Sequence, residues 1–345
     1  MAIAEPLYSR SAVNKAGRML AGHLNRSNRL TPEENEWATA RVVDWRTCHS
    51  YPLQVLHRSI LSASTLWDTD VLIVQRLKRF ESILLKLRRH PNMAATQMQD
   101  IGGCRAILKD TQSACLAVAK LRSKKKVHVL HEEYDYNAIP QPDGYRGIHL
   151  VYKFRSRMIP ALNDMRIELQ FRSMAQHAWA TAVEIIDTFT GQSLKNKRGE
   201  AHWRNFFALV SAMVAIQEGT APVPGISTDI RTLKRRLYNA YLICGVREVV
   251  ASIHELEARV ARQSSGDIAY YLLMLNTKDS ELEILEFAAD QRQDAVIAYY
   301  EAEQVKKVNA VMVTSGSIQD VKEAYPNYFG DLQNFMELLA GLGIP

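Results

Sequence analysis

Length and composition indicate a folded globular protein. The chain has 345 residues, of which 47% are hydrophobic and 23% are charged, whereas disordered chains are poorer in hydrophobic residues. This length accommodates two domains of ordinary size. The sequence holds no apolar run of about 20 residues that would span a bilayer, and its N-terminus has no apolar signal-peptide core. We therefore expect a cytoplasmic protein without membrane contact.

The clustered positive charge indicates a class of binding partner, and the cysteine spacing argues against two kinds of structural site. The net charge is +6, and the excess lies in short runs such as RLKRF, RSKKK and LKRRL. Such runs favour a polyanionic partner, either nucleotide phosphates or a nucleic acid, although a solvated charged surface explains any single run equally well. The four cysteines form no Cys-x-x-Cys pair, which disfavours a disulfide framework and a zinc ribbon.

Residues 1–70 have helical patterns. Thr31 followed by Pro32 and two acids is typical of a helix N-terminus. The periodicity over 72–89 predicts a second strong helix, which His90 and Pro91 would end.

From Asp100 onward the patterns predict an α+β fold with a mixed sheet flanked by helices. The expected strands are 100–110, 126–134, 147–154 and 166–172, and the expected helices are 111–123, 173–189 and 203–219. The Pro- and Gly-rich stretch 219–228 reads as a linker.

The remaining residues predict a second, smaller domain. A long amphipathic helix is expected over 229–262, and a β-β-α-β series follows it. The sequence therefore predicts an N-terminal domain over 1–218, a linker over 219–228 and a C-terminal domain over 229–345.

Three polar side chains repeat at helical spacing within the helix expected over 72–89. Lys78, Ser82 and Lys86 are four residues apart, so they would lie on one face. Two ammonium groups with a hydroxyl between them suit a chain of phosphates. The solvated face of an amphipathic helix is the open alternative.

Two expected strands carry polar side chains on alternate positions. The strand over 166–172 would place Arg166, Glu168, Gln170 and Arg172 on one face, and the strand over 147–154 would present His149 likewise. Adjacent polar faces would form a floor of acids and bases, although an ordinary solvent-exposed sheet face has the same pattern.

A carboxylate and an aromatic ring complete the candidate site. Asp100 precedes two glycines that allow a ligand close to the backbone, and together with Glu168 it offers oxygen ligands for Mg²⁺; capping a turn is the alternative. Tyr145 lies beside Arg146 in a Pro/Gly loop, where an aromatic ring is suited to stack on a base or to close a hairpin.

Three ordered motifs resemble one known family. DIGGCR, DGYRGIHLVY and IELQFRSMAQHAWATAVE are similar to the motifs of the synthetase domain of RelA/SpoT alarmone synthetases, and the likeness covers roughly residues 40–215. It implies a nucleotidyltransferase-like fold and a pyrophosphokinase that moves the β,γ-pyrophosphate of ATP to a ribose 3′-hydroxyl.

The resemblance also implies roles for the residues. Asp100 would bind Mg²⁺, and Glu168 would activate the acceptor hydroxyl and assist the metal. The residues implied to bind ATP are Arg76 and Arg105 on the adenine and Lys78, Ser82 and Lys86 on the phosphates. The residues implied to bind the acceptor are Tyr145, Arg146, His149, Gln170 and Arg172.

The resemblance leaves two acceptors open. The first is the 3′-terminal adenosine of tRNA, modified by a toxic synthetase that stops translation, and the alternative is GDP or GTP, modified by a small alarmone synthetase. Basic residues available to follow tRNA are Lys124, Lys125, Lys126, Lys195, Lys197 and Arg198.

The C-terminal domain favours the tRNA acceptor. Its β-β-α-β order without zinc ligands resembles the pseudo-zinc-finger domain of CapRel-type fused toxin–antitoxin proteins of antiphage defence. The resemblance implies that Tyr325 and Tyr328 plug the ATP site and that a phage capsid protein relieves this autoinhibition, whereas local packing of the two tyrosines is the ordinary alternative.

Overall fold

The computed structural model describes eight stretches of the chain: 3–23, 30–123, 127–190, 200–257, 268–276, 281–305, 308–314 and 332–345. They form two compact units. The first unit comprises Met1–Ala106, Leu116–Tyr134 and His149–Phe171, and the second comprises Ile107–Cys115, Asp135–Ile148 and Arg172–Pro345.

The helical pattern at the start of the chain is confirmed, and the structure divides it into α1 (Arg10–His23), α2 (Pro32–Cys48) and α3 (Ser50–Ser64). The expected N-cap is confirmed, because Thr31 Oγ1 accepts from the Glu34 amide while the Glu34 carboxylate accepts from the Thr31 amide. This capping box satisfies amide groups that the first helical turn leaves free. Helix α1 packs against α2 and against α4 (Phe80–Arg89) around a shared hydrophobic core.

The helix expected over 72–89 is wrong in its first half. Residues Leu72–Leu77 form strand β1, and only Phe80–Arg89 form helix α4. The first half reads LIVQRL, in which Ile73 and Val74 are β-branched and favour an extended backbone. Lys78 therefore lies in the connection between β1 and α4, and the expected helical face of Lys78, Ser82 and Lys86 holds only for the last two.

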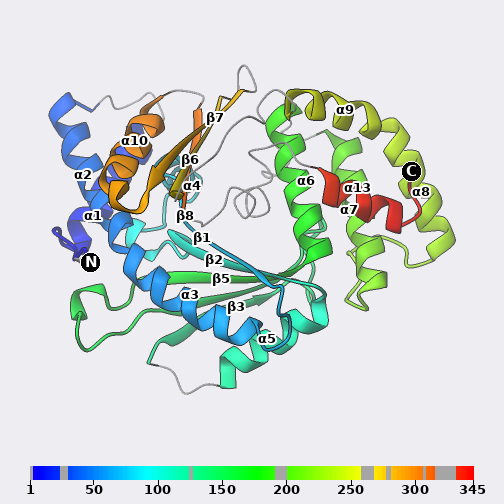
Figure 1. Cartoon of the computed structure of the whole chain (residues 1–345), viewed down its shortest axis with the longest axis horizontal. Coiled ribbons are helices and arrows are strands. Elements are labelled where there is room, and N and C mark those ends of the chain that lie inside the picture. Colours follow the sequence, from blue (N-terminus) through cyan, green and yellow to red (C-terminus); the bar gives the residue numbers. More distant parts are fainter. Residues whose placement is uncertain are drawn as a thin grey trace. The chain divides into compact units, whose positions relative to one another are not determined.

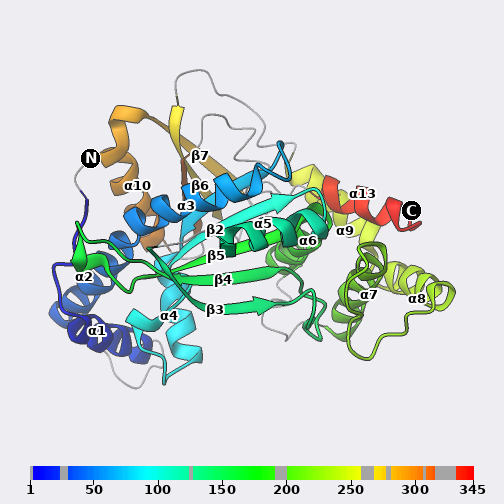
Figure 2. The ribbon, with the colours of Figure 1, turned by 90° about the horizontal axis from the view of Figure 1, so that it is seen from below.

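A five-stranded sheet in the order β1-β2-β5-β4-β3 confirms the expected α+β fold with a mixed sheet. Its other strands are β2 (Gly102–Leu108), β3 (Val129–Asp135), β4 (Ile148–Lys153) and β5 (Arg166–Ser173); Figure 2 shows them side by side. Helix α5 (Thr111–Ser123) joins β2 to β3, and short 3₁₀ turns occur at Ala95–Gln97 and Pro160–Leu162. Helix α3 packs beside β1 (Figure 1).

Strand β5 alternates as the sequence predicts. Ile167, Leu169 and Phe171 are fully buried, whereas Glu168 and Gln170 on the opposite face are half-buried. The strands pack closely here, because a Cβ added at Gly102 would lie 2.6 Å from the Ile167 side chain.

Five of the described helices of the second unit share one hydrophobic core. They are α6 (Met174–Thr190), α7 (Ala201–Gln217), α8 (Ile230–Ile243), α9 (Val246–Glu257) and α13 (Gln333–Gly341). The prediction of a single helix over 229–262 is wrong, because the described residues of this range form two helices, α8 and α9, with a break between them. Gly245 has φ +56 at the break, a conformation that ends helices and favours glycine. The domain boundaries at 219–228 remain a prediction.

A small antiparallel sheet also belongs to the second unit. Strands β6 (Ile268–Asn276), β7 (Glu281–Ala288) and β8 (Val308–Thr314) are arranged in the order β7-β6-β8. A 3₁₀ turn (Ala289–Gln291) leads into α10 (Arg292–Gln304), which packs on the sheet around Leu272 and Tyr299. The described strands and helix therefore have the expected β-β-α-β order.

Several predicted residues lie outside the described stretches. They are Tyr325, Tyr328, Lys124, Lys125, Lys126, Lys195, Lys197 and Arg198. Among the helices that the structure describes, none has the length and apolar character to cross a membrane.

Candidate active site

Asp100 is held between two lysines in the first unit. Lys78 Nζ lies 2.9 Å from Asp100 Oδ2, and Lys86 Nζ lies 2.9 Å from Oδ1. Burial alone would raise the pKa of Asp100, but the two ammonium groups outweigh it and hold that pKa at about 2. Burial also lowers the pKa of Lys78, against the attraction of the Asp100 carboxylate. The carboxylate is therefore ionised at neutral pH.

The connection after β1 positions Lys78. Its amide donates to the Ile101 carbonyl at 2.7 Å, one residue after Asp100, and its own carbonyl accepts from Arg46 Nε at 2.6 Å. Lys86 reaches the same carboxylate from α4, where Ser82 lies one turn earlier. The two lysines thus converge on Asp100 from a loop and a helix.

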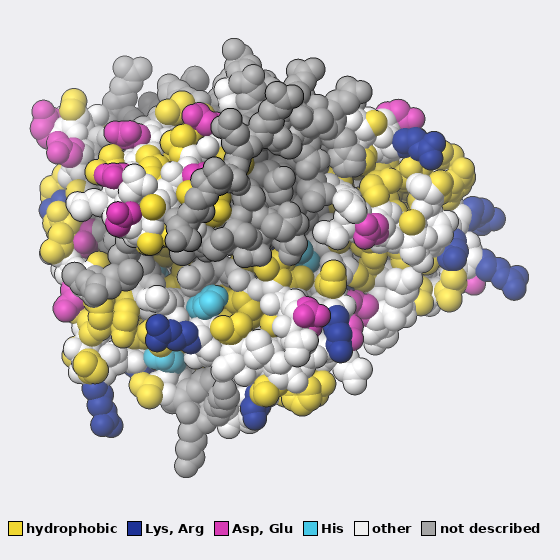
Figure 3. Space-filling model, in the orientation of Figure 1, with side chains coloured by type: hydrophobic (Ala, Val, Ile, Leu, Met, Phe, Trp, Pro, Cys, Tyr) yellow, Lys and Arg dark blue, Asp and Glu magenta, His cyan; other side chains and the backbone are white. Residues whose placement is uncertain are grey.

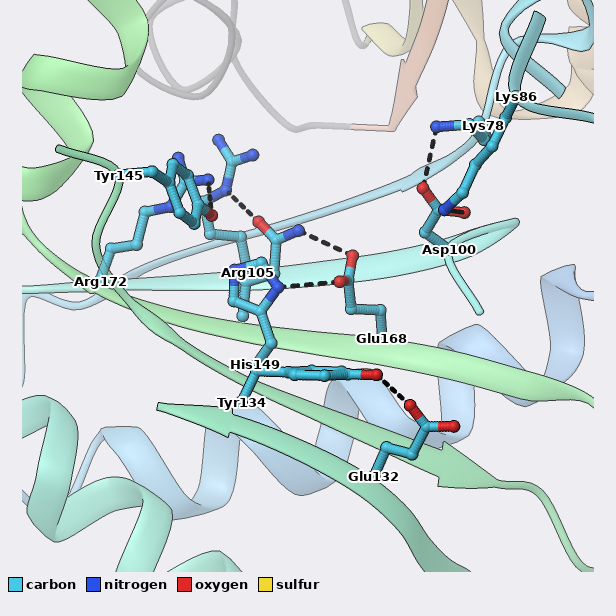
Figure 4. A network of polar contacts seen from close by, with 11 residues as sticks. Lys78, Lys86, Asp100, Arg105, Glu132, Tyr134, Tyr145, His149, Glu168 and Arg172 are labelled. Carbon is cyan, nitrogen blue, oxygen red and sulfur yellow. Dashed lines mark hydrogen bonds and ion pairs between the residues drawn. The ribbon is translucent and has the colours of Figure 1, made fainter. Parts of the chain in front are cut away.

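A chain of hydrogen bonds crosses three adjacent strands and fixes Glu168 (Figure 4). His149 Nδ1 on β4 donates to Glu168 Oε1 at 2.9 Å, and Gln170 Nε2 donates to Oε2 at 2.8 Å. Gln170 Oε1 accepts in turn from Arg105 Nε on β2 at 3.1 Å. Both oxygens of Glu168 are therefore oriented by donors, and each keeps a lone pair for a further partner.

The charge of Asp100 acts on the pKa of Glu168. Burial raises the pKa of Glu168, and so does the negative charge of Asp100. The hydrogen bond and the charge of His149 lower this pKa by more, so that the net shift is downward. Two ionised carboxylates that interact electrostatically offer oxygen ligands for a divalent cation. Mg²⁺ is commonly held by one or two carboxylates, with substrate phosphates and water completing its shell. The donor set fits Mg²⁺, and the described residues hold no cluster of three or more His, Cys, Asp or Glu that would form a cage for a metal.

Sequence reasoning missed two side chains on β3. Tyr134 donates a hydrogen bond to Glu132, and the pKa of Tyr134 is raised by this bond, by burial and by the charges of Glu132 and Glu168. Because the charge of Glu168 acts on the pKa of Tyr134, the two side chains lie within electrostatic range of each other (Figure 4). The signal in the sequence was their alternate spacing, but HVLHEEY is polar on both faces and does not distinguish them.

The two arginines expected to bind adenine lie on neighbouring strands. Arg76 is exposed on β1, and half-buried Arg105 lies on β2. Arg105 contacts Gln170, which links the expected donor side to the expected acceptor side.

In the second unit, Tyr145 is fixed by ring and hydroxyl contacts. Its hydroxyl accepts from Arg172 Nη2 at 2.6 Å, and the Arg172 guanidinium lies 5.1 Å from the ring centroid. The ring also makes edge contacts with Tyr136 and Trp179, at centroid distances of 5.5 and 6.5 Å. Arg172 is 5% exposed, and its Nε has no partner among the described residues. Arg146 follows Tyr145 in the chain, yet its guanidinium contacts α7 and the residues after it.

Comparisons with known proteins point to one family region. Residues 75–186 match the model described as the region found in RelA / SpoT proteins. The GTP pyrophosphokinases YwaC and YjbM of Bacillus subtilis (strain 168) are 29% and 31% identical to this chain over 111 residues. The alignments cover 31% and 32% of this chain and 52% of each relative, so the chain spans about half the length of these curated relatives.

A solved structure is similar over a larger part. Small alarmone synthetase 1 from Bacillus subtilis, bound to its product pppGpp, has a TM-score of 0.41 and 20% identity, over 49% of this chain and 88% of that one. The cluster around Asp100 and Glu168 lies within the part of the chain that matches the RelA / SpoT region.

Proposed function

We propose that this protein is a pyrophosphokinase that transfers the β,γ-pyrophosphate of ATP to the 3′-hydroxyl of a ribose. The observation that carries the proposal is the Asp100 carboxylate between Lys78 and Lys86, in electrostatic range of the oriented Glu168. Lysines that converge on one point suit the phosphates of a nucleotide. An ionised carboxylate with fixed oxygens suits the removal of a hydroxyl proton.

The proposed reaction is a displacement at the β-phosphorus of ATP. The acceptor 3′-oxygen forms a bond to the β-phosphorus, and the bond from that phosphorus to the oxygen bridging to the α-phosphate breaks. AMP leaves with that oxygen and the bonding electron pair, while the hydroxyl proton passes to Glu168. His149 and Gln170 hold Glu168 in place for this step.

Asp100 and Glu168 would hold Mg²⁺. When bound, such an ion neutralises charge on the phosphate oxygens. Lys78 and Lys86 would then exchange the Asp100 carboxylate for the phosphates of ATP, with Ser82 beside them on α4 and with Arg76 and Arg105 on the adenine. Tyr145, supported by Arg172, would stack on the acceptor base.

The proposed acceptor is the 3′-terminal adenosine of tRNA. Among the described residues, a dense run of exposed cations lies on α8, and Figure 3 shows Lys and Arg side chains projecting around this helix. The run consists of Arg231, Lys234, Arg235 and Arg236. A polyanion such as tRNA gains from an extended basic surface, which a single nucleotide does not need. The alternative acceptor is GDP or GTP, and the names of the two Bacillus relatives favour it.

We further propose that the C-terminal region, which would be a pseudo-zinc-finger domain, inhibits the enzyme until a phage capsid protein binds it. Tyr325 and Tyr328 would occupy the adenine position between Arg76 and Arg105, partly through cation–π contact. In this proposal the protein blocks translation in antiphage defence.

The test incubates the purified protein with γ-labelled ATP and either tRNA, GDP or GTP. Label on tRNA, absent after removal of the terminal adenosine, supports the proposed acceptor. Label only on guanosine nucleotides would replace tRNA by the alternative, and no transfer under any condition, with Tyr325→Ala and Tyr328→Ala combined, would contradict the enzyme proposal.

A further inference from the structure

Arg146 is a buried cation whose guanidinium donates hydrogen bonds to α7 and to the residues that follow it. The residue is 3% exposed. Nε donates to Ser211 Oγ at 3.0 Å, Nη1 to Thr220 Oγ1 at 3.1 Å, and Nη2 to the Ala221 carbonyl at 2.7 Å. The partners belong to α7 and to the first residues after it. Burying a guanidinium is costly unless it is hydrogen-bonded, so this arrangement needs its partners.

Ser211 binds the loop on the other side of Tyr145 as well. Its hydroxyl donates to the Gly144 carbonyl at 2.6 Å. Gly144 has φ +92, and a Cβ added there would lie 2.8 Å from Ser211 Cβ. The backbone is therefore pressed against α7 at Gly144 and tied to it through Arg146. Gly144 and Arg146, the residues on either side of Tyr145 in the chain, are therefore both hydrogen-bonded to Ser211.

The residues after α7 also hold the beginning of this loop. The Ala221 amide donates to the Asn137 carbonyl at 3.2 Å. Gln176 Nε2 donates to Asn137 Oδ1 at 3.0 Å and to Glu218 Oε2 at 2.9 Å. The stretch 218–221 thus contacts the loop near its start, at Asn137, and near its end, at Arg146.

We propose that Arg146 is a positioning residue of the acceptor site. Together with Ser211 and residues 218–221 it forms a clamp, here called the α7 clamp, that sets the backbone on which Tyr145 presents its ring. Arg146 itself does not touch the acceptor. This inference rests on the proposed function, in which Tyr145 stacks on the acceptor base.

Two variants test the clamp without a gross change of volume or charge. Thr220→Val is isosteric and removes one acceptor of Arg146. Arg146→Lys keeps the charge, but its single ammonium group does not reproduce the planar fork that reaches three partners. The matched control is Thr65→Val at the end of α3, whose hydroxyl donates, within the described stretches, to the local Leu61 carbonyl alone. Thermal unfolding of all three verifies that they fold.

The steady-state measurement separates positioning from a purely structural role. Loss of one hydrogen bond in the clamp is expected to raise KM for the acceptor about three- to tenfold in Thr220→Val, and more in Arg146→Lys, with KM for ATP unchanged. The control should behave as the wild type. Equal increases in both KM values, or no change in either, would overturn the proposal.

A second measurement does not depend on turnover. Amide hydrogen exchange of residues 137–147 should become faster in Thr220→Val and Arg146→Lys while exchange in α3 stays unchanged. Unchanged exchange in this loop would overturn the clamp even if the enzyme is active. Faster exchange in a protein that transfers nothing would support the clamp and contradict only the proposed reaction.

Discussion

Lys86 Nζ lies 2.9 Å from Asp100 Oδ1, although 14 residues separate them in the chain. Lys78 makes the matching contact with the other carboxylate oxygen. Asp100 thus occupies both cations that are proposed to bind the phosphates of ATP. Binding of Mg-ATP would exchange these partners, so that the lysines take phosphate oxygens and Asp100 takes the metal.

Asp100→Asn separates the two proposed roles of this cluster. Without the carboxylate, Lys78 and Lys86 lose their anionic partner, so metal-free ATP is expected to bind more tightly than to the wild type. Turnover with Mg²⁺ should fall at least about 100-fold, because the variant lacks one of the two carboxylates that are proposed to hold the metal in the transition state. Calorimetric titration with ATP in the presence of chelator, alongside turnover with Mg²⁺, measures both effects.

The control for this variant is Asp164→Asn. Asp164 has φ +69, which asparagine tolerates, and its side chain is well exposed beside Arg155. Wild-type binding and turnover are expected here. Weaker metal-free ATP binding in Asp100→Asn would show that the lysines do not meet the phosphates.

Glu168→Gln tests the proposed base. The amide keeps nearly the same shape but cannot accept the hydroxyl proton, so kcat should fall about 100-fold or more, with KM for ATP little changed. Steady-state kinetics at saturating acceptor separates the two constants. A loss confined to KM would assign Glu168 to substrate binding alone.

The sequence identified Lys78, Lys86 and Asp100 as candidate site residues, but the helical geometry predicted for the two lysines was wrong. Lys78 and Lys86 were expected on one helix, yet a strand and a loop bring Lys78 to Asp100. The run LIVQRL fits either period over so few residues, and β-branched Ile73 and Val74 favour the strand. The alternation in RIELQFR was decisive, since burial of Ile167, Leu169 and Phe171 fixes which face carries Glu168.

The contacts of Arg146 had no sequence signal. Its partners lie 65 to 75 residues away, and local patterns do not report such distances. The same limit applies to α13, which belongs to the core of α6 and α7 although it ends the chain.

Gly144 and Gly225 form a matched pair for backbone strain. Both have positive φ, but only a Cβ at Gly144 meets other atoms, whereas Gly225 has open space. Gly225→Ala should cost about 1 kcal/mol for the left-handed backbone alone. Gly144→Ala should cost about 1–3 kcal/mol more, through overpacking against Ser211. Denaturant unfolding of the two variants measures the difference, and equal costs would contradict the close approach of this loop to α7.

His49 predicts a loss of stability at mildly acidic pH. Burial lowers its pKa to about 4, although its Nδ1–H donates to the Trp45 carbonyl. The folded protein therefore holds His49 neutral, while the unfolded chain binds a proton below pH of about 6.5. Its contribution is complete above that pH and is lost as the pH falls toward 4, by up to about 3 kcal/mol.

His49→Gln should flatten this part of the pH profile. Unfolding free energies at pH 7 and pH 5 measure the slope, and exposed His90→Gln serves as control. An unchanged slope in His49→Gln would mean that His49 does not titrate on unfolding.

Phe335 tests whether the last helix stabilises the second unit. The residue is 1% exposed. The centroid of its ring lies 5.9 Å from that of Phe207 and 6.2 Å from that of Phe206. Phe335→Ala should destabilise the protein by about 3–5 kcal/mol, whereas Leu242→Ala, at a residue 57% exposed, should change little. Thermal unfolding measures both. A mild effect of Phe335→Ala would contradict a stabilising role of this ring in the core of the second unit.

The fate of doubly labelled ATP tests the central claim most directly. ATP carrying one label in the adenine and another in the γ-phosphate is incubated with the protein, Mg²⁺ and each acceptor, and the products are separated. The account predicts AMP carrying the adenine label, with the γ-label in the acceptor in equal amount, and at least about 100-fold less of both products in Asp100→Asn. Release of ADP and orthophosphate instead would contradict pyrophosphate transfer.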